Sequence, residues 1–227
     1  MSKTALILCG GKGTRFSTVS TQPKILANFR GEPFIKWLID YIEDHGFLEV
    51  IFSLGYKSDS IIRYLERIPL RKISIKYIVE TSPLGTGGAI KGYFENQKPD
   101  EVYIFNGDTF FSKKMPEKLF SESYSDQIVV VCKKFSINDR YGHFEVVNGK
   151  FSIKRGTTVN PIINSQVYCG VVRIPKLTDF KKLLPPFSTE NLLLNQDLKL
   201  NILSYDGEMI DYGIPDAYDQ LRTIYEI

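Results

Sequence analysis

Short apolar segments alternate with amphipathic segments from the N-terminus to about residue 140. The apolar segments carry few polar side chains, which is typical of strands covered on both faces. This alternation predicts an α/β fold with a mostly parallel sheet between helices. We expect strands at 6–9, 50–54, 73–79, 102–105, 128–132 and 167–174, and helices at 33–46, 59–67, 86–95, 116–124, 189–199 and 216–225.

The pattern changes after about residue 140. Residues 144–147 and 151–153 flank Asn148-Gly149, a dipeptide typical of hairpin turns. We therefore expect a Rossmann-like three-layer sandwich with a mixed, mostly parallel central sheet. An α/β chain of 227 residues often forms one domain, so residues 1–227 are expected to make a single domain.

Charge and composition argue against several classes of partner. Lysine plus arginine exceed aspartate plus glutamate by only three, 29 against 26, and the basic residues form no run. Neither nucleic acid nor a membrane surface is therefore expected as a partner. The apolar stretch at the N-terminus spans about five residues, too short for a signal peptide or a spanning helix, so we expect a cytoplasmic protein.

The three cysteines, Cys9, Cys132 and Cys169, lie far apart in apolar segments. An odd number of separated cysteines does not form a metal-ligand pattern. We interpret them as buried thiols, in preference to metal ligands or nucleophiles.

The first strand runs directly into a loop that contains Gly10, Gly11 and Gly13 and is followed by Arg15. Glycines let the backbone approach a ligand with its N–H groups exposed, and an arginine adds a planar fork for phosphate oxygens. The loop is not a P-loop, because Gly13 stands where Ser or Thr is required, and the third glycine of a dinucleotide fingerprint would fall at Phe16. The loop favours another kind of nucleotide site, with a purely structural turn as the alternative.

Three more places follow apolar segments, where ligands of open α/β sheets bind. One is the loop from Pro83 to Gly88, which opens a helix whose N–H groups are available to a ligand. The others are Asp108 and Asp211. Single residues also have alternative readings: the Asn-Gly before Asp108 is also a hairpin signal, and Asp211 is also a typical turn residue. Lys24, taken by itself, is more typical of a solvated surface lysine.

The order of these signals along the chain resembles the sugar nucleotidylyltransferases. The motifs are L-C-G-G-K-G-T-R-F at 8–16, Q-P-K-I-L at 22–26, E-T-S-P-L-G-T-G-G-A-I at 80–90, N-G-D at 106–108, R-Y-G-H-F at 140–144, F-S-I-K at 151–154 and I-D-Y-G-I-P-D-A-Y at 210–218. Within that superfamily, P-L-G-T-G-G-A-I, F-S-T-E at 187–190 and the last motif are most similar to D-glycero-D-manno-heptose 1-phosphate guanylyltransferases.

The resemblance implies the nucleotide-diphospho-sugar transferase fold and one reaction. A sugar 1-phosphate oxygen attacks the α-phosphorus of a nucleoside triphosphate and gives an NDP-sugar and pyrophosphate. A sugar phosphate has a second pKa of about 6, so the step needs charge compensation and alignment instead of a general base. The implied catalytic residues are Arg15, Lys24, Asp108 and Asp211, and the two aspartates would hold Mg²⁺.

The resemblance also implies two sets of binding residues. The set for the nucleotide is Leu8, Cys9, Gly10, Gly11, Gly13, Thr14, Arg15, Glu80, Pro83, Gly85, Thr86, Gly107 and Asp108. The set for the sugar phosphate is Gly142, Lys154 and Tyr168. The carboxylate of Glu80 suits the N1–H and 2-amino donors of guanine, which predicts GTP, whereas a solvated Glu80 beside the following turn is the alternative.

Two departures from the family pattern concern the acceptor. Many relatives have Glu-Lys where this chain has Ile153-Lys154, and Tyr168-Cys169-Gly170 replaces Asn-Ala-Gly or Asn-Gly-Gly. The identity of the acceptor therefore stays open, as does the oligomeric state, a homo-oligomer included. A cytidylyl- or uridylyltransferase for another phosphorylated acceptor and a non-catalytic nucleotide-sugar sensor are the alternative functions, and the intact charged residues disfavour the sensor.

Overall fold

The computed structural model describes residues 3–69, 71–137, 142–147, 150–155 and 162–225, and the chain divides into two compact units. The first unit comprises residues 1–84, 105–114 and 208–227, and the second comprises residues 85–104 and 115–207. The first unit is therefore assembled from three separate segments of the chain.

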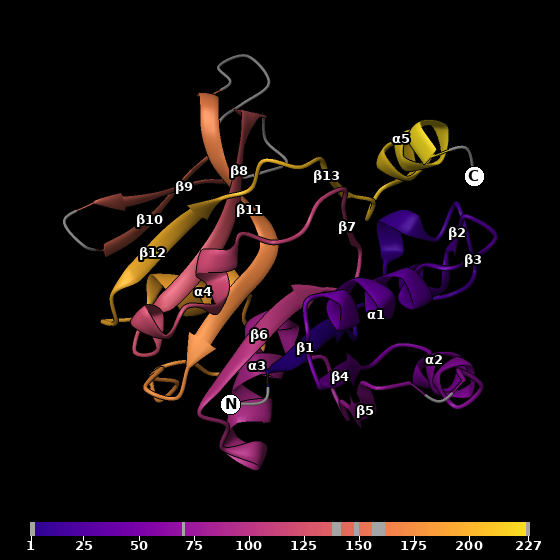
Figure 1. Cartoon of the computed structure of the whole chain (residues 1–227), viewed down its shortest axis with the longest axis horizontal. Coiled ribbons are helices and arrows are strands. Elements are labelled where there is room, and N and C mark those ends of the chain that lie inside the picture. Colours follow the sequence, from indigo (N-terminus) through magenta and orange to yellow (C-terminus); the bar gives the residue numbers. More distant parts are fainter. Residues whose placement is uncertain (1–2, 70, 138–141, 148–149, 156–161, 226–227) are drawn as a thin grey trace. The chain divides into compact units, whose positions relative to one another are not determined.

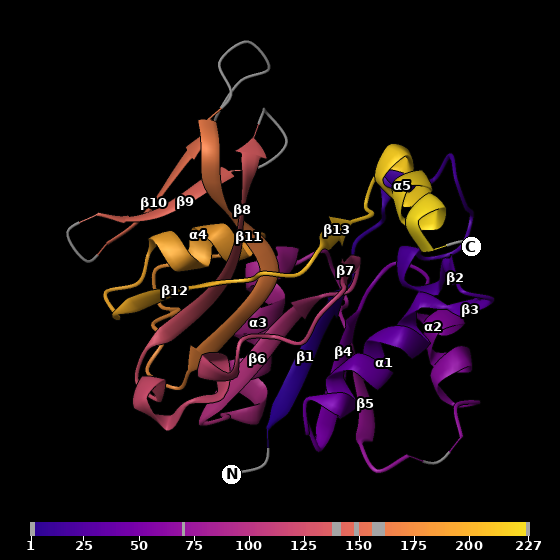
Figure 2. The ribbon, with the colours of Figure 1, turned by 45° about the horizontal axis from the view of Figure 1, so that its top comes forward.

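A parallel sheet forms the centre of the first unit (Figure 1). It contains β1 (Thr4–Cys9), β4 (Glu49–Leu54) and β5 (Ser74–Val79), with β4 between the other two. The last two residues of β6 (Glu101–Asn106) also belong to this unit. The helices α1 (Phe34–Asp44) and α2 (Ser58–Leu65) lie beside these strands (Figures 1 and 2). Most apolar residues of β1 and β4 are fully buried, as expected of strands in a parallel sheet.

The remaining elements of the first unit are short. β7 (Thr109–Phe111) pairs antiparallel with β13 (Met209–Asp211), and this pairing sets Asp211 opposite Thr109. The others are η1 (Thr14–Phe16), η2 (Lys24–Leu26), β2 (Asn28–Phe29), β3 (Glu32–Pro33) and α5 (Pro215–Tyr225). The β7–β13 pair thus brings two segments that are distant in the sequence next to each other.

The second unit holds a mixed sheet. β11 (Ile162–Pro175) pairs antiparallel with β8 (Ile128–Ile137) and β9 (Gly142–Val147), β9 pairs with β10 (Lys150–Arg155), and β12 (Leu200–Ser204) runs parallel to β8. α4 (Thr189–Leu194) lies against β10 and α3 (Gly85–Gln97) (Figure 2). No helix in the described part of the chain is both long and apolar enough to cross a membrane.

The predicted α/β class with a mixed, mostly parallel central sheet is confirmed. The predicted hairpin is present as the antiparallel pair β9–β10, although its turn at 148–149 lies outside the described residues. A hairpin at Asn106-Gly107 is wrong, because β7 pairs with β13 and not with β6. The assignment of residues 1–227 to one domain stays a prediction.

The helix expected at 116–124 is wrong. The segment forms two 3₁₀ helices, η3 (Glu117–Phe120) and η4 (Glu122–Tyr124). Ser121 interrupts the helical path because its backbone is extended and its hydroxyl accepts from the backbone N–H of Ser123 at 3.3 Å. Serine side chains that bond to nearby backbone groups favour such breaks.

The helix expected at 189–199 ends early, at Leu194. The side chain of Gln196 bonds to the backbone of Asp179 in both directions, accepting from its N–H at 2.9 Å and donating to its carbonyl at 2.8 Å. The segment after Leu194 is therefore held by another part of the second unit instead of continuing the helix.

An aromatic cluster joins the three segments of the first unit. Phe16 packs edge-on against Tyr212 and Tyr218, with ring centroids 6.1 and 5.2 Å apart, and Phe34 lies 4.8 Å from Tyr212. The fully buried hydroxyl of Tyr212 lies 3.3 Å from the carbonyl oxygens of both Lys24 and Gly107. Its backbone N–H donates to the carbonyl of Asp108 at 3.1 Å. Tyr212 thus connects the backbone of Lys24, Asp108 and its own neighbour Asp211.

Replacing Tyr212 by Phe tests this connection. The change keeps the ring packing but removes the O–H donor shared between the two carbonyls, so we expect the free energy of unfolding to fall by about 0.5–1.5 kcal/mol. Tyr212→Ala should cost about 3–5 kcal/mol because it also leaves a cavity. Urea denaturation measures both values, and equal stability of Tyr212→Phe and wild type would contradict the role assigned to the hydroxyl.

Candidate active site

The glycine-rich loop of the first unit leads from β1 into η1. Gly13 has φ 60°, a left-handed conformation that favours glycine, and a Cβ there would lie 3.0 Å from Cε of Lys24. Gly10 is held by its carbonyl, which accepts from the N–H of Tyr56 at 3.0 Å. A Cβ on Gly55 would lie only 2.5 Å from that same carbonyl oxygen. The loop is therefore fixed from both sides by close backbone and side-chain approaches.

The exposed side of the loop carries two cations. Arg15 and Lys12 are both exposed, as are Gly11 and Thr14. Neither Arg15 nor Lys12 has an ion pair within the described residues. Both cations are thus available to an anion at the loop. Sequence reasoning assigned this task to Arg15 alone, although Lys12 sits among the same glycines.

Lys24 and the two predicted aspartates converge in the first unit. The ammonium of Lys24, in η2, donates to Oδ2 of Asp108 at 2.6 Å, and both side chains are about one quarter exposed. Asp108 stands in the turn before β7, and Asp211 is the last residue of β13, opposite Thr109. The β7–β13 pairing therefore brings the carboxylates of Asp108 and Asp211 close to each other.

Gly213 marks the point of convergence. A Cβ added to it would lie 3.0 Å from Oδ1 of Asp211, 3.1 Å from Oδ2 of Asp108 and 3.1 Å from Nζ of Lys24. The N–H of Gly213 donates to Oδ1 of Asp211 at 2.9 Å. A side chain at this position would crowd the three charged groups, so Gly213 is a further candidate site residue, which the sequence marked only as part of the motif at 210–218.

Two convergent carboxylates suit Mg²⁺. This hard cation prefers oxygen ligands, keeps several waters, and is usually held by one or two carboxylates together with substrate phosphates. Among the described residues there is no cluster of three or more His, Cys, Asp or Glu side chains that could hold a metal by themselves. The donor set of Asp108 and Asp211 therefore fits a metal shared with a phosphate-bearing substrate, and does not form a closed structural site.

Gly107 and Glu80 line the other side of the loop. The N–H of Gly107 donates to the carbonyl of Leu8 at 3.0 Å, and a Cβ on Gly107 would lie 3.0 Å from Cβ of Cys9.

Glu80 follows β5, and its Oε1 would lie 3.0 Å from a Cβ on Gly10. The Glu80 carboxylate accepts from the Ser53 hydroxyl at 2.9 Å. It therefore lies directly against the glycine loop.

The loop from Pro83 onward has a structural role in addition to the predicted one. A Cβ on Gly85, with φ 73°, or on Gly87 would collide with Phe187. The hydroxyl of Thr86 accepts from the N–H of Thr189 at 2.8 Å, so it binds the first residue of α4. Pro83 is exposed. Close packing of α3 on the segment before α4 thus accounts for two of these glycines, and nucleotide binding by Gly85 and Thr86 stays a prediction.

The residues predicted for the sugar phosphate lie on three neighbouring strands of the second unit. His143 of β9 faces Lys154 of β10 on one side and Val167 of β11 on the other, and Gly142 faces Arg155. The side chain of Lys154 lies outside the described residues. Tyr168 follows Val167, and its ring lies 5.7 Å from that of Phe144. The register therefore brings Gly142, Lys154 and Tyr168 into one region of the sheet.

The phenol of Tyr168 is buried without a hydrogen-bond partner among the described residues. Burial, and after it the charge of Glu190, raises the pKa of this phenol well above its ordinary value. The hydroxyl of Thr189 is likewise buried and unpartnered. Buried hydroxyl groups without partners are uncommon and carry a free-energy cost of about 1–3 kcal/mol, which a polar ligand would offset.

Two of the three cysteines fit the prediction of buried thiols, whereas Cys9 is of intermediate exposure. Cys132 and Cys169 are buried and free, and Cys9 is free with its thiol donating to the carbonyl of Ser53 at 3.2 Å. Burial raises the pKa of Cys132 to about 12 and raises the pKa of Cys9 further. These thiols are protonated near neutral pH, which is unsuitable for a nucleophile or a metal ligand.

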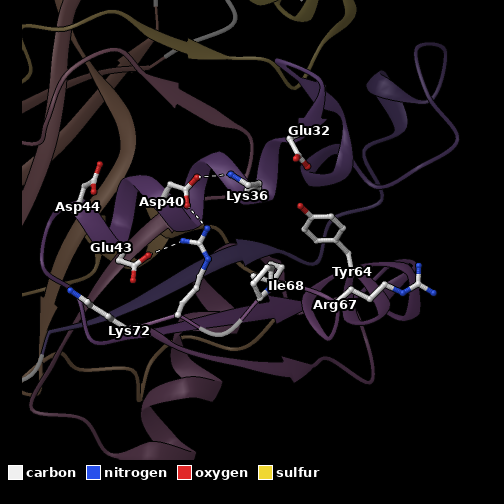
Figure 3. A pocket seen from close by; sticks show the side chains of 11 residues that line it. Glu32, Lys36, Asp40, Glu43, Asp44, Tyr64, Arg67, Ile68 and Lys72 are labelled. Atoms are coloured by element: carbon white, nitrogen blue, oxygen red, sulfur yellow. Dashed lines mark hydrogen bonds and ion pairs between the residues drawn. The ribbon is translucent and has the colours of Figure 1, made fainter.

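A separate groove of about 1060 Å³ lies on the first unit, lined by residues of α1, α2 and the segment before β5 (Figure 3). Four of its charged side chains pair with one another. Arg71 contacts Asp40 and Glu43, and Lys36 lies 3.1 Å from Asp40 (Figure 3). None of the predicted site residues lines this groove.

The comparisons with known proteins identify the family of the chain. The model of the MobA-like NTP transferase domain family matches residues 5–154. A D-glycero-alpha-D-manno-heptose 1-phosphate guanylyltransferase of Campylobacter jejuni is 36% identical over 220 residues, 94% of this chain and 96% of that protein. The protein of the same name from Aneurinibacillus thermoaerophilus is 33% identical, with 94% of each chain covered.

Solved structures agree as well. HddC from Yersinia pseudotuberculosis is 30% identical with a TM-score of 0.78, covering 98% of this chain and 99% of its own. A structure of HddC complexed with GMP-PN has a TM-score of 0.77. The inositol-1-phosphate CTP transferase from T. maritima, 16% identical with a TM-score of 0.73 and covering 99% of this chain and 97% of its own, shares the fold. This chain therefore belongs to the MobA-like NTP transferase family and is a nucleotidyltransferase of the sugar nucleotidylyltransferase group, similar over nearly its whole length to heptose 1-phosphate guanylyltransferases.

Proposed function

We propose that this protein transfers GMP from GTP to a heptose 1-phosphate in a Mg²⁺-dependent reaction, giving GDP-heptose and pyrophosphate. The observation that carries the proposal is the convergence of Lys24, Asp108 and Asp211 at Gly213, beside a glycine loop with two exposed cations. The names of the two relatives that match nearly the whole chain support the heptose phosphate and the guanylyl group.

The proposed chemistry depends on alignment and charge compensation. An oxygen of the sugar phosphate forms a bond to the α-phosphorus, the bond from that phosphorus to the bridging oxygen breaks, and its electron pair leaves with pyrophosphate. The nucleophile is already ionised near neutral pH, because its second pKa is about 6. A metal held by Asp108 and Asp211 would supply charge compensation for the phosphate oxygens. Arg15 would bind the leaving phosphates, and Lys24 would bind the phosphate that is transferred.

The proposed acceptor site belongs to the second unit. Gly142, Lys154 and Tyr168 lie on adjacent strands, and Tyr168 offers a buried hydroxyl that has no partner among the described residues. In this proposal, Lys154 binds the phosphate of the acceptor and Tyr168 lies at the sugar. The phenol would then discriminate among sugars by the hydroxyl group that satisfies it.

The proposed base specificity depends on Glu80. The carboxylate is fixed against Gly10 of the glycine loop, and a carboxylate can accept from the N1–H and the 2-amino group of guanine together. Adenine, cytosine and uracil do not offer this pair of donors.

The metal role predicts the effect of removing either carboxylate charge. Asp108→Asn and Asp211→Asn should each lower kcat/KM at least about a hundredfold, or about 3 kcal/mol, because the charge on the transferred phosphate is no longer compensated. Release of pyrophosphate, with and without EDTA, measures this effect. The exposed Asp219 of α5 provides the matched control, since Asp219→Asn should retain activity. Full activity in EDTA would rule out the metal.

In the proposed mechanism, Lys154 binds the sugar phosphate and Lys24 binds the phosphate that is transferred. Replacing each lysine should therefore have a different kinetic effect. Lys154→Ala should raise the KM of the sugar phosphate much more than that of GTP, because loss of a charge-assisted hydrogen bond costs about 1.5–3 kcal/mol. Lys24→Ala should lower kcat with little change in the KM of the sugar phosphate. Initial-rate kinetics with each substrate varied in turn test this, with the exposed Lys176→Ala as the control. The reverse pattern would exchange the two assignments.

The base assignment predicts that GTP is the preferred triphosphate among the four common ones. Glu80→Gln replaces one acceptor by a donor at nearly constant size and should weaken the use of GTP by about 1–3 kcal/mol. The KM of the sugar phosphate should stay unchanged. A wild-type preference for CTP or UTP, or an unchanged preference in Glu80→Gln, would refute the guanine assignment while leaving the transferase activity intact.

A further inference from the structure

We infer that Ser53 is a positioning residue for base selection, acting by holding the carboxylate of Glu80 in the orientation that reads guanine. The inference rests on the proposed function, in which Glu80 contacts the base. Ser53 is absent from the sequence motifs because it lies in the middle of an apolar strand, V-I-F-S-L, where it resembles a tolerated small residue.

The hydroxyl of Ser53 contacts the carboxylate of Glu80 directly. Ser53 is 4% exposed and lies in β4, between Leu8 of β1 and Ile78 of β5 in the sheet register. Its hydroxyl donates to Oε1 of Glu80 at 2.9 Å. The buried hydroxyl thus has a charged acceptor, which makes the bond stronger than one between neutral groups.

The orientation of the Glu80 carboxylate depends mainly on the hydrogen bond from Ser53. The N–H of Glu80 donates to the carbonyl of Leu54 at 2.8 Å, which fixes the main chain. The carboxylate itself has one other described donor, the N–H of Leu84, at a longer 3.4 Å. Without Ser53, the carboxylate would rotate more freely about its terminal torsion, which has a broad energy profile.

Base reading requires a fixed carboxylate plane. Two parallel hydrogen bonds to guanine form only when both oxygens face the two donors of the base, and such paired contacts gain specificity from their geometry. Ser53 uses one lone pair of Oε1 and leaves acceptor capacity on both oxygens. The role assigned to Ser53 therefore belongs to its hydroxyl, which contacts one oxygen of the Glu80 carboxylate.

The test compares GTP with ITP, which lacks the 2-amino group. In Ser53→Ala, the ratio of kcat/KM for GTP to that for ITP should fall by roughly three- to tenfold, as expected for one lost hydrogen bond. The KM of the sugar phosphate should not change. Ser53→Thr keeps the hydroxyl and should retain the wild-type ratio. Because the ratio is measured within one preparation, a smaller folded fraction of a variant cancels from it.

A double-mutant cycle separates positioning from a general effect on stability. In the Glu80→Gln background, Ser53→Ala should change the ratio no further, because its effect passes through the carboxylate. Thr178→Val is the matched control, since it removes a buried hydroxyl that bonds to the carbonyl of Pro175 at 2.8 Å, and it should lower Tm without altering the ratio.

The possible results are distinguishable. A wild-type protein that prefers GTP, with an unchanged ratio in Ser53→Ala or an equal loss in both backgrounds, would overturn the inference and leave the proposed function standing. A wild-type protein that prefers another base would overturn both. A lower ratio in Ser53→Ala that disappears in the Glu80→Gln background would support the positioning role.

Discussion

The proximity of two carboxylates, Asp108 and Asp211, is the constraint that the site residues of the first unit must satisfy. Like charges held together raise the free energy of the folded protein unless positive charge is nearby. Lys24 supplies such a charge at 2.6 Å from Asp108. The β7–β13 pairing brings the two aspartates together, Tyr212 fixes the surrounding backbone, and Gly213 leaves the space open. In our proposal, a metal ion and two phosphate-bearing substrates complete this balance of charge.

This arrangement explains why the protein needs no acid–base machinery for its proposed reaction. The pKa values of the Cys9 and Cys132 thiols are raised by desolvation, and burial lowers the pKa of His45, whose ring nitrogen lies 2.6 Å from the carbonyl of Tyr41 at the end of α1. A phosphate nucleophile brings its own charge, so the protein contributes cations, oxygen ligands for a metal and backbone N–H groups. The first unit holds all the residues proposed for metal binding and phosphate transfer, and the second unit holds those proposed for the acceptor.

The sequence predicted those features that depend on local chemistry. Apolar strands, the glycine loop and the order of the charged motifs follow from short segments, and the α/β class and the family are confirmed. Short sequence segments do not reveal contacts between residues that are distant along the chain. Ser53 looks unremarkable among its sequence neighbours, and its partner Glu80 lies far along the chain. Tyr212 and Gly213 belong to the motif at 210–218, but their proximity to Lys24 becomes visible only in the folded protein. The helix predicted at 116–124 failed because serine side chains compete for the backbone, and the helix after Leu194 failed because Gln196 bonds to Asp179. The roles of the individual site residues stay predictions.

The position of the metal tests the central claim most directly. Crystals grown with Mn²⁺ and a non-hydrolysable GTP analogue would reveal the metal by its anomalous scattering. The account predicts one strong peak within coordination distance of the carboxylates of Asp108 and Asp211 and of a phosphate oxygen, with the ammonium of Lys24 directed to a phosphate. A metal bound by other residues, or a nucleotide bound with its phosphates away from Gly213, would contradict it.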